Sequence, residues 1–135
     1  MSKKQKKYEK TSHATYNCGY HLIWCPKYRR KVLVDEIEKR LKELLIEKAL
    51  EHKWSIEKME VMPDHVHVFI KVRTVDSPAH IVSQLKGFTA FSLRKEFPSL
   101  RSRLPSMWTR SYFCESVGHI SEATIKKYIE EQKNK

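Results

Sequence analysis

The stretch EVMPDHVHVFIKV occupies residues 60–72, and the predicted fold is built around it. After His65 every second residue is a β-branched apolar one, which is the period of a half-buried β-strand. The other face of this strand carries His65, His67, Phe69 and Lys71. Side chains two apart point the same way, so the two imidazoles are expected close enough to share one divalent metal ion. For such a pair taken alone a solvated polar face is the simpler explanation, and only a matching ligand elsewhere favours the metal site.

Composition limits the domain number, the location and the class of partner of this chain. The chain has 135 residues, which is enough for one domain with a single core. No apolar run is long enough to span a membrane and no secretory signal is recognisable, so a cytoplasmic location is expected. Three cysteines without a CxxC spacing argue against a disulfide framework and a zinc ribbon. The 27 Lys and Arg residues outnumber 16 Asp and Glu, and a formal charge of +11 favours a polyanionic partner, first of all nucleic acid.

Apolar periodicity on both sides of this stretch predicts the remaining elements. Strands are expected at residues 15–24, 54–61, 65–73 and 112–117, and helices at residues 34–52, from Ser77 to before Pro98, and from Ser121 to the C-terminus. This order predicts an α+β fold, the ferredoxin-like or RRM-like βαββαβ arrangement, with a four-stranded antiparallel sheet, two helices on one face and an added C-terminal helix. Residues 1–12 are interpreted as a basic flexible tail and residues 13–135 as a single domain. The sheet face that carries the histidines is expected to be left open by the first two helices.

Two basic segments are candidates for contact with a nucleic-acid backbone. They contain Lys27, Arg29, Arg30 and Lys31 after the first strand, and Arg101, Arg103 and Arg110 in residues 100–111, which are predicted to form a loop. A solvated basic loop explains the first cluster nearly as well. In the second, Trp108 either stacks on unpaired bases beside the arginines or closes the edge of the core.

The predicted C-terminal helix places Tyr128 and Gln132 four residues apart, hence on one face. Taken alone, Tyr128 belongs to an ordinary docking stripe with Ile125 and Ile129. Taken with the histidine pair, it acquires a second interpretation. A phenol can attack a phosphodiester when a metal ion polarises the phosphate, and an amide oxygen one turn further on can complete the ligand set.

Four segments, in order, resemble the small single-tyrosine HUH transposases of the TnpA type, which are encoded by insertion sequences that move as single-stranded DNA. They are YHLIWCPKYR at residues 20–29, MEVMPDHVH at 59–67, WTRSY at 108–112 and IKKYIEEQ at 125–132. The resemblance covers essentially the whole chain after the basic tail.

The resemblance implies a role for each matching residue. His65 and His67 would be metal ligands with Gln132 as the third, and the metal would be Mg²⁺ or Mn²⁺. Tyr128 would attack single-stranded DNA to give a 5′-phosphotyrosine link and a free 3′-OH. Such proteins form homodimers in which the histidines of one subunit can be paired with the tyrosine helix of the other. They recognise DNA hairpins near the ends of the element and cleave and rejoin strands there.

Two other functions fit parts of the same pattern. One is a non-catalytic single-strand nucleic-acid-binding module on the same frame, although the third strand lacks the usual aromatic pattern. The other is an HUH nicking endonuclease of the replication-initiator type, which usually carries a further helicase or primase domain. Asp64 is interpreted as a turn residue that could orient an imidazole. His13, His21, His52, His80 and His119 are taken as surface or core histidines.

Overall fold

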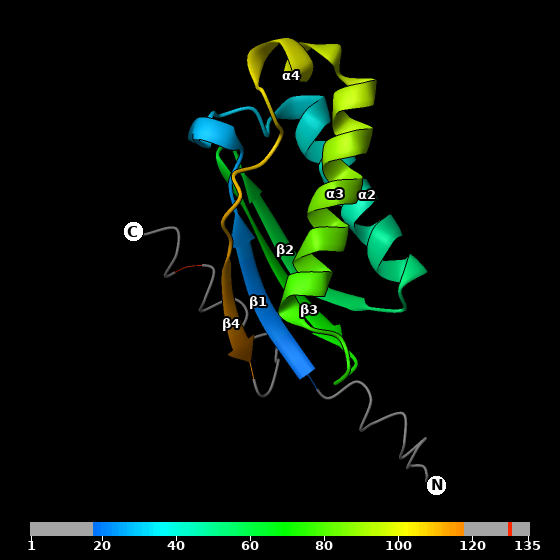
Figure 1. Ribbon diagram of the computed structural model, residues 1–135. Coiled ribbons are helices and arrows are strands. Elements are labelled where there is room, and N and C mark those ends of the chain that lie inside the picture. The colour runs from blue at the N-terminus through cyan, green and yellow to red at the C-terminus, as the bar shows by residue number, and fades with distance from the viewer. Residues whose placement is uncertain (1–17, 118–129, 131–135) are drawn as a thin grey trace, which may run out of the picture.

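The computed structural model describes residues 18–117 and residue 130, and Figure 1 shows how its elements are arranged. In chain order they are β1 (Cys18–Trp24), the short 3-10 helix η1 (Lys27–Arg29), α2 (Asp35–Glu51), β2 (Ser55–Met62), β3 (His65–Val72), α3 (Pro78–Glu96), α4 (Pro98–Arg103) and β4 (Phe113–Val117). The predicted succession βαββαβ is therefore confirmed. The predicted C-terminal helix falls outside the described residues except for residue 130. No helix in the described part is long and apolar enough to cross a membrane.

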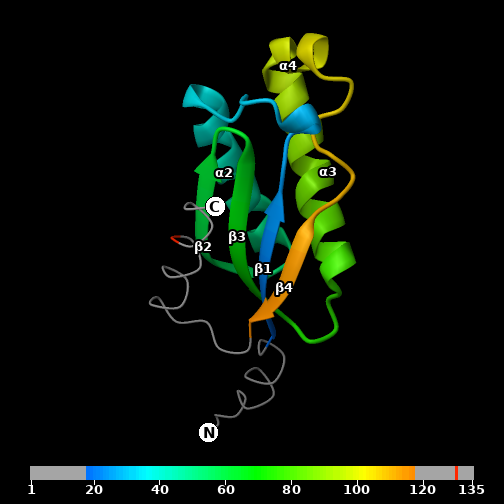
Figure 2. The same ribbon diagram turned by 90° about the vertical axis from the view of Figure 1, so that its left-hand side faces the viewer.

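The four strands form one antiparallel sheet in the order β2-β3-β1-β4. Both long helices, α2 and α3, lie behind this sheet in Figure 2, so they cover one face only. The register places His21 of β1 opposite Phe69 of β3, and Ile23 opposite His67. Since directly paired residues point to the same face, His21 shares a face with the predicted ligand pair.

The helix-covered face carries the apolar half of each strand. Leu22 and Trp24 of β1 and the β-branched residues of β3 are buried there. Leu41, Leu44, Leu45 and Ala49 of α2 and Ile81, Val82, Leu85 and Leu93 of α3 pack against them. The predicted start of α3 is also confirmed, because the Ser77 hydroxyl accepts a hydrogen bond from the His80 amide at 3.1 Å and Pro78 opens the helix.

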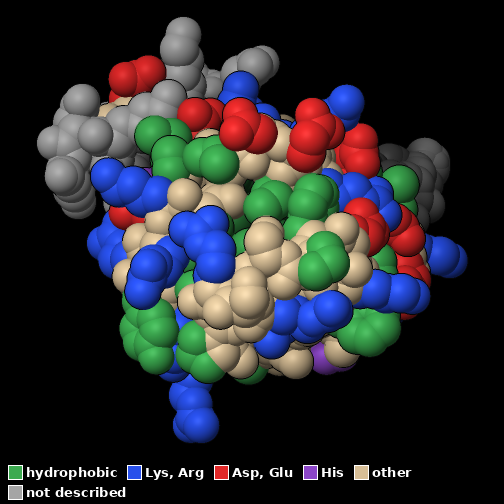
Figure 3. All heavy atoms as spheres, turned by 90° about the horizontal axis from the view of Figure 1, so that it is seen from above, with side chains coloured by type: hydrophobic (Ala, Val, Ile, Leu, Met, Phe, Trp, Pro, Cys, Tyr) green, Lys and Arg blue, Asp and Glu red, His purple; other side chains and the backbone are tan. Residues whose placement is uncertain are grey.

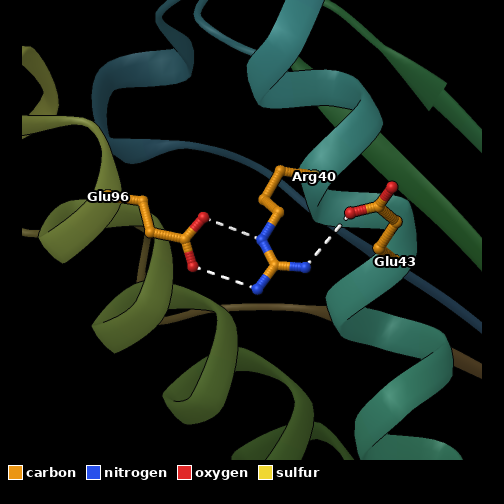
Figure 4. Close-up of polar contacts among 3 residues, drawn as sticks. All are labelled: Arg40, Glu43 and Glu96. Carbon is orange, nitrogen blue, oxygen red and sulfur yellow. Dashed lines mark hydrogen bonds and ion pairs between the residues drawn. The ribbon is translucent and has the colours of Figure 1, made fainter.

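The two long helices are joined at their surface by a fork-shaped ion pair. Arg40 of α2 donates through Nε and Nη2 to the two carboxylate oxygens of Glu96 on α3, at 2.7 and 3.1 Å (Figure 4). A third bond, from Nη1, reaches Glu43 at 3.1 Å. Hydrogen bonds from Arg40 lower the pKa of Glu96, so this carboxylate stays ionised and is directed towards α2.

The segment after α3 corrects one prediction. Residues 100–111 are not a loop throughout, since α4 spans Pro98–Arg103. Pro98 does end α3 as expected, but its fixed φ also suits the first position of a helix, so a new one starts there. Leu100 anchors α4 in the core with no exposed surface.

Trp108 closes the edge of the core, and the alternative of an exposed stacking surface is wrong. Only 6% of its surface is exposed, and its ring meets Trp24 edge-on at 6.0 Å. Its Nε1 donates to the Thr89 hydroxyl at 3.1 Å, and that hydroxyl donates to the Leu85 carbonyl at 2.8 Å.

Trp108→Ala is expected to lower the free energy of unfolding by about 3–5 kcal/mol, because it leaves a cavity where an indole filled the core edge. Trp108→Phe keeps most of the packing and loses the bond to Thr89, so a smaller loss of about 1–2 kcal/mol is expected. Urea denaturation of the three proteins measures both. A Trp108→Ala protein within 1 kcal/mol of the original would contradict this placement.

Candidate functional site

The predicted ligand pair lies at the start of β3, on the sheet face opposite the helices. The rings of His65 and His67 meet edge-on with their centres 4.9 Å apart. His65 is partly exposed and His67 is buried. The side-by-side arrangement expected from the period of two is confirmed.

Asp64, in the turn before β3, holds the first of these imidazoles. Its Oδ1 lies 2.7 Å from Nδ1 of His65, and its Oδ2 accepts from Nη2 of Arg29 at 3.1 Å. Burial opposes ionisation, but the bonds from His65 and Arg29 outweigh it and lower the pKa of Asp64. An ionised Asp64 accepts a hydrogen bond from Nδ1–H, which leaves Nε2 of His65 free of a proton and able to ligate.

His21 of β1 makes the corresponding contact with the second imidazole. Its Nε2 lies 3.2 Å from Nδ1 of His67, in the buried part of the site. Its ring is stacked on Phe69, with centres 4.2 Å apart and planes within 5°. Oε1 of Glu115 on β4 lies 4.0 Å from Nδ1 of His21. Burial lowers the pKa of His21 to about 4, so it is neutral near pH 7.

His21, which the sequence predicts only as a surface or core histidine, contacts the predicted pair directly. Alternation along β1 could have placed it on the face that bears Gly19 and Ile23. Only the strand order, however, brings β1 beside β3.

Both histidines of the pair therefore use Nδ1 in a hydrogen bond, which makes Nε2 the nitrogen that can bind a metal. Within residues 18–117 and residue 130, no group of three His, Cys, Asp or Glu side chains converges as a metal site. The predicted third ligand, Gln132, and the predicted nucleophile, Tyr128, lie outside the described residues.

Most of the predicted DNA-contacting residues lie at one end of the molecule. Lys27 and Arg29 belong to η1, which Arg30 and Lys31 follow, and Arg101 and Arg103 lie on α4. Figures 1 and 2 both place η1 and α4 at the same end, and the amide of Lys27 donates to the carbonyl of Met107 at 2.9 Å. Arg110 is exposed further along, in the segment that leads to β4.

Two residues of η1 have a backbone conformation that is uncommon for residues other than glycine. Tyr28 and Arg29 have φ values of 60° and 52°, in the left-handed region. Such conformations persist only where surrounding contacts hold them, and they are frequent at functional sites. Here the holding contacts include the Arg29–Asp64 ion pair, so this basic turn is fixed against the histidine site.

Residues 14–132 match the protein family described as IS200-like transposase. The chain belongs to this family. It is a transposase of the single-tyrosine type, as the resemblance implied.

Two curated relatives support this membership. The ISDra2 transposase TnpA of Deinococcus radiodurans is 38% identical over 122 residues, which cover 89% of this transposase and 87% of the relative. The transposase of insertion sequence IS200 from Salmonella typhimurium is 30% identical over 124 residues, which cover 90% and 80% of the two chains.

Solved structures give the same result for the fold. A crystal structure of a candidate transposase from Deinococcus radiodurans aligns with a TM-score of 0.69 and 36% identity, over 84% of this transposase and 89% of that chain. A REP-associated tyrosine transposase bound to a REP hairpin aligns with a TM-score of 0.59 over 83% of this chain and 62% of its own, at 12% identity. At that identity the second match supports the fold alone.

The low pKa of His21 predicts how the metal-free transposase responds to acid. Unfolded histidine takes up a proton below about pH 6.5, whereas folded His21 does so only near pH 4. The unfolded state thus binds more protons in this window, and stability falls as the pH falls through it, by up to about 3 kcal/mol from this group. His21→Phe keeps a ring against Phe69 but cannot titrate. Its free energy of unfolding in urea should therefore fall less between pH 7 and pH 4 than that of the original protein. Equal losses in the two proteins would show that His21 is not the group responsible.

Proposed function

We propose that this transposase cleaves and rejoins single-stranded DNA at the ends of an insertion sequence through a 5′-phosphotyrosine intermediate on Tyr128. The observation that carries the proposal is the His65–His67 pair, with both Nδ1 atoms in hydrogen bonds, in a chain of this family. A geometry of this kind prepares two neutral imidazoles to ligate one ion through Nε2.

The donor set fits a divalent cation, Mg²⁺ or Mn²⁺. His65, His67 and Gln132 would hold it, and three neutral ligands leave its full charge available to the phosphate. When bound, the ion would neutralise charge that develops on the phosphate oxygens. Imidazole nitrogen suits Mn²⁺ better than Mg²⁺, so Mn²⁺ is expected to bind more tightly.

Asp64 and His21 act as positioning residues in this proposal. Asp64 accepts a hydrogen bond from the Nδ1–H of His65, and Nε2 of His21 accepts one from the Nδ1–H of His67. Each bond fixes a ring and its tautomer, so that Nε2 is the unprotonated nitrogen. Neutral His21 suits this task, because a protonated imidazole could not accept the bond.

Tyr128 supplies the nucleophile. Its phenol gives up its proton as the oxygen bonds to phosphorus, the bond from phosphorus to the 3′ oxygen breaks, and that oxygen takes up one proton and leaves as a 3′-OH. The phosphotyrosine retains the energy of the phosphodiester, so a 3′-OH from another strand can reverse the attack. Cleavage and joining therefore need no external energy source.

The DNA itself is proposed to be a single strand with hairpins near the ends of the element. A net charge of +11 and the basic residues around η1 and α4 suit phosphate contacts. Hairpin recognition is proposed from the resemblance to transposases of this type, and a protein that shares this fold was solved bound to a REP hairpin. We also propose a homodimer, in which Tyr128 of one subunit can complete the histidine site of the other.

The test is incubation of the full chain with labelled single-stranded DNA from its own element's ends, with and without Mg²⁺ or Mn²⁺, followed by denaturing gels. We expect a metal-dependent protein–DNA adduct and, when both ends are present, joined strands. The same DNA as a perfect duplex should give neither product. Tight binding without an adduct would favour the non-catalytic binding module, and nicking without joined products would favour a replication-initiator type of activity.

A further inference from the structure

A groove lies on the helix side of the molecule, away from the histidine face. It has a volume of about 540 Å³ and is formed by the last turns of α3, by α4 and by residues 105–107. Ala90, Phe91, Pro105 and Met107 contribute apolar surface to it. None of the residues assigned above to metal binding or strand cleavage lines it.

Phe91 is the unusual residue of this groove. It is 68% exposed, although a phenylalanine is normally buried. Nζ of Lys95 lies 5.9 Å from the centre of its ring, so the aromatic face already lies beside a cation. An exposed aromatic ring next to positive charge is the arrangement on which nucleic-acid bases stack.

Three cations border the apolar surface: Arg94, Lys95 and Arg101. Arg94 donates to the carbonyl of Leu104 at 3.0 Å, and Arg101 donates to the carbonyl of Arg94 at 3.1 Å. These bonds hold both guanidinium groups in place and use only some of the five N–H donors on each. They are therefore ordered before a phosphate arrives.

No carboxylate is among the residues that line the groove. The nearest acid in sequence, Glu96, is bound by the fork of Arg40 on the side that faces α2 (Figure 4). Seen from the α4 end, Asp and Glu side chains gather along one edge, apart from a broad area where Lys and Arg lie around uncharged surface (Figure 3). The charge of the groove complements a phosphate backbone.

We propose that this groove binds an unpaired nucleotide of the DNA, with its base stacked on Phe91 and its flanking phosphates at Arg94, Lys95 and Arg101. The inference rests on the proposed function, because it assigns a second contact to the same DNA. The α3 side of the sheet is opposite the His65–His67 face, so the groove binds a segment distant from the cleaved bond. Its effect is on DNA affinity and not on the chemical step.

The experiment compares Phe91→Ser with Leu50→Ser, an equally exposed residue (68%) on α2, and with Phe91→Trp. Fluorescence anisotropy measures the affinity of each full-length protein for a hairpin with single-stranded flanks. Phe91→Ser should bind roughly tenfold more weakly, since it loses the stacking of one base, while Leu50→Ser and Phe91→Trp should bind like the original. Lys95→Gln should weaken binding and reduce the slope of log affinity against log salt by about one, whereas Phe91→Ser should leave that slope unchanged.

Adduct formation at saturating DNA separates this inference from the proposed function. Phe91→Ser should reach the adduct level of the original protein, because the chemistry lies on the other face. If the original forms the adduct and Phe91→Ser binds DNA as tightly as it does, the groove proposal is wrong and the function stands. If light scattering shows that Phe91→Ser alters the oligomeric state while its DNA affinity is unchanged, the groove contacts protein and the proposal also fails. If the original forms no adduct, the proposed function fails on its own test, and the binding comparison still decides the groove.

Discussion

Tyr128→Phe transposase is expected to form no covalent adduct with single-stranded DNA, a loss of at least about 10³-fold relative to the original protein. The substitution removes one hydroxyl oxygen and keeps the ring, so packing and DNA affinity should change little. If Tyr128 is the nucleophile as proposed, no bond to phosphorus can form without that oxygen, and neither cleavage nor joining follows. Denaturing gels of labelled DNA measure the adduct, and anisotropy in the same buffer measures binding.

A matched control is Tyr112→Phe, which removes a phenol oxygen from an exposed tyrosine close to β4. It should form the adduct as the original does. Adduct formation by Tyr128→Phe at more than a few per cent of the original level would mean that another residue is the nucleophile. Loss in both variants would show that the substitutions act through folding.

His67→Ala is expected to weaken Mn²⁺ binding by at least about 100-fold and to reduce adduct formation to a similar extent. It removes a proposed, buried ligand that contacts His21, and a site with two remaining protein ligands would hold the ion poorly. Electron paramagnetic resonance of free Mn²⁺ gives the affinity without reference to activity. His21→Phe should show a smaller loss, of about 10- to 100-fold, because His67 remains but its tautomer is no longer fixed.

His80→Ala is the control for this pair of variants, since His80 is exposed and packs edge-on against Trp54 on the helix side. It should bind Mn²⁺ normally. Because His67 is buried, melting temperatures in EDTA must show that His67→Ala is folded. Unchanged Mn²⁺ affinity in a folded His67→Ala protein would remove His67 from the ligand set.

The sequence was sufficient for features that depend on neighbouring residues. The period of two around His65 and His67 placed both on one face, and the Ser77-Pro78 pair located the start of α3. Both results follow from local geometry, which the order of residues determines almost completely.

Contacts between residues far apart in the sequence could not be predicted from local patterns. His21 has no characteristic spacing, and its contact with His67 exists only because β1 lies beside β3 in the sheet. Trp108 suited a core edge and a stacking surface equally well until its contacts with Trp24 and Thr89 were known. The helix α4 was missed because a proline that ends one helix can also start the next.

The fork between Arg40 and Glu96 has a consequence for mutational surveys of this protein. Arg40→Ala would release the Glu96 carboxylate, next in sequence to Lys95 of the groove. The released carboxylate would repel a phosphate at the groove, so DNA affinity would fall even though Arg40 does not line it. A survey that scores activity alone would therefore assign Arg40 to the DNA-contacting surface. Arg40→Ala combined with Glu96→Gln should recover most of the lost affinity, which would identify the effect as indirect.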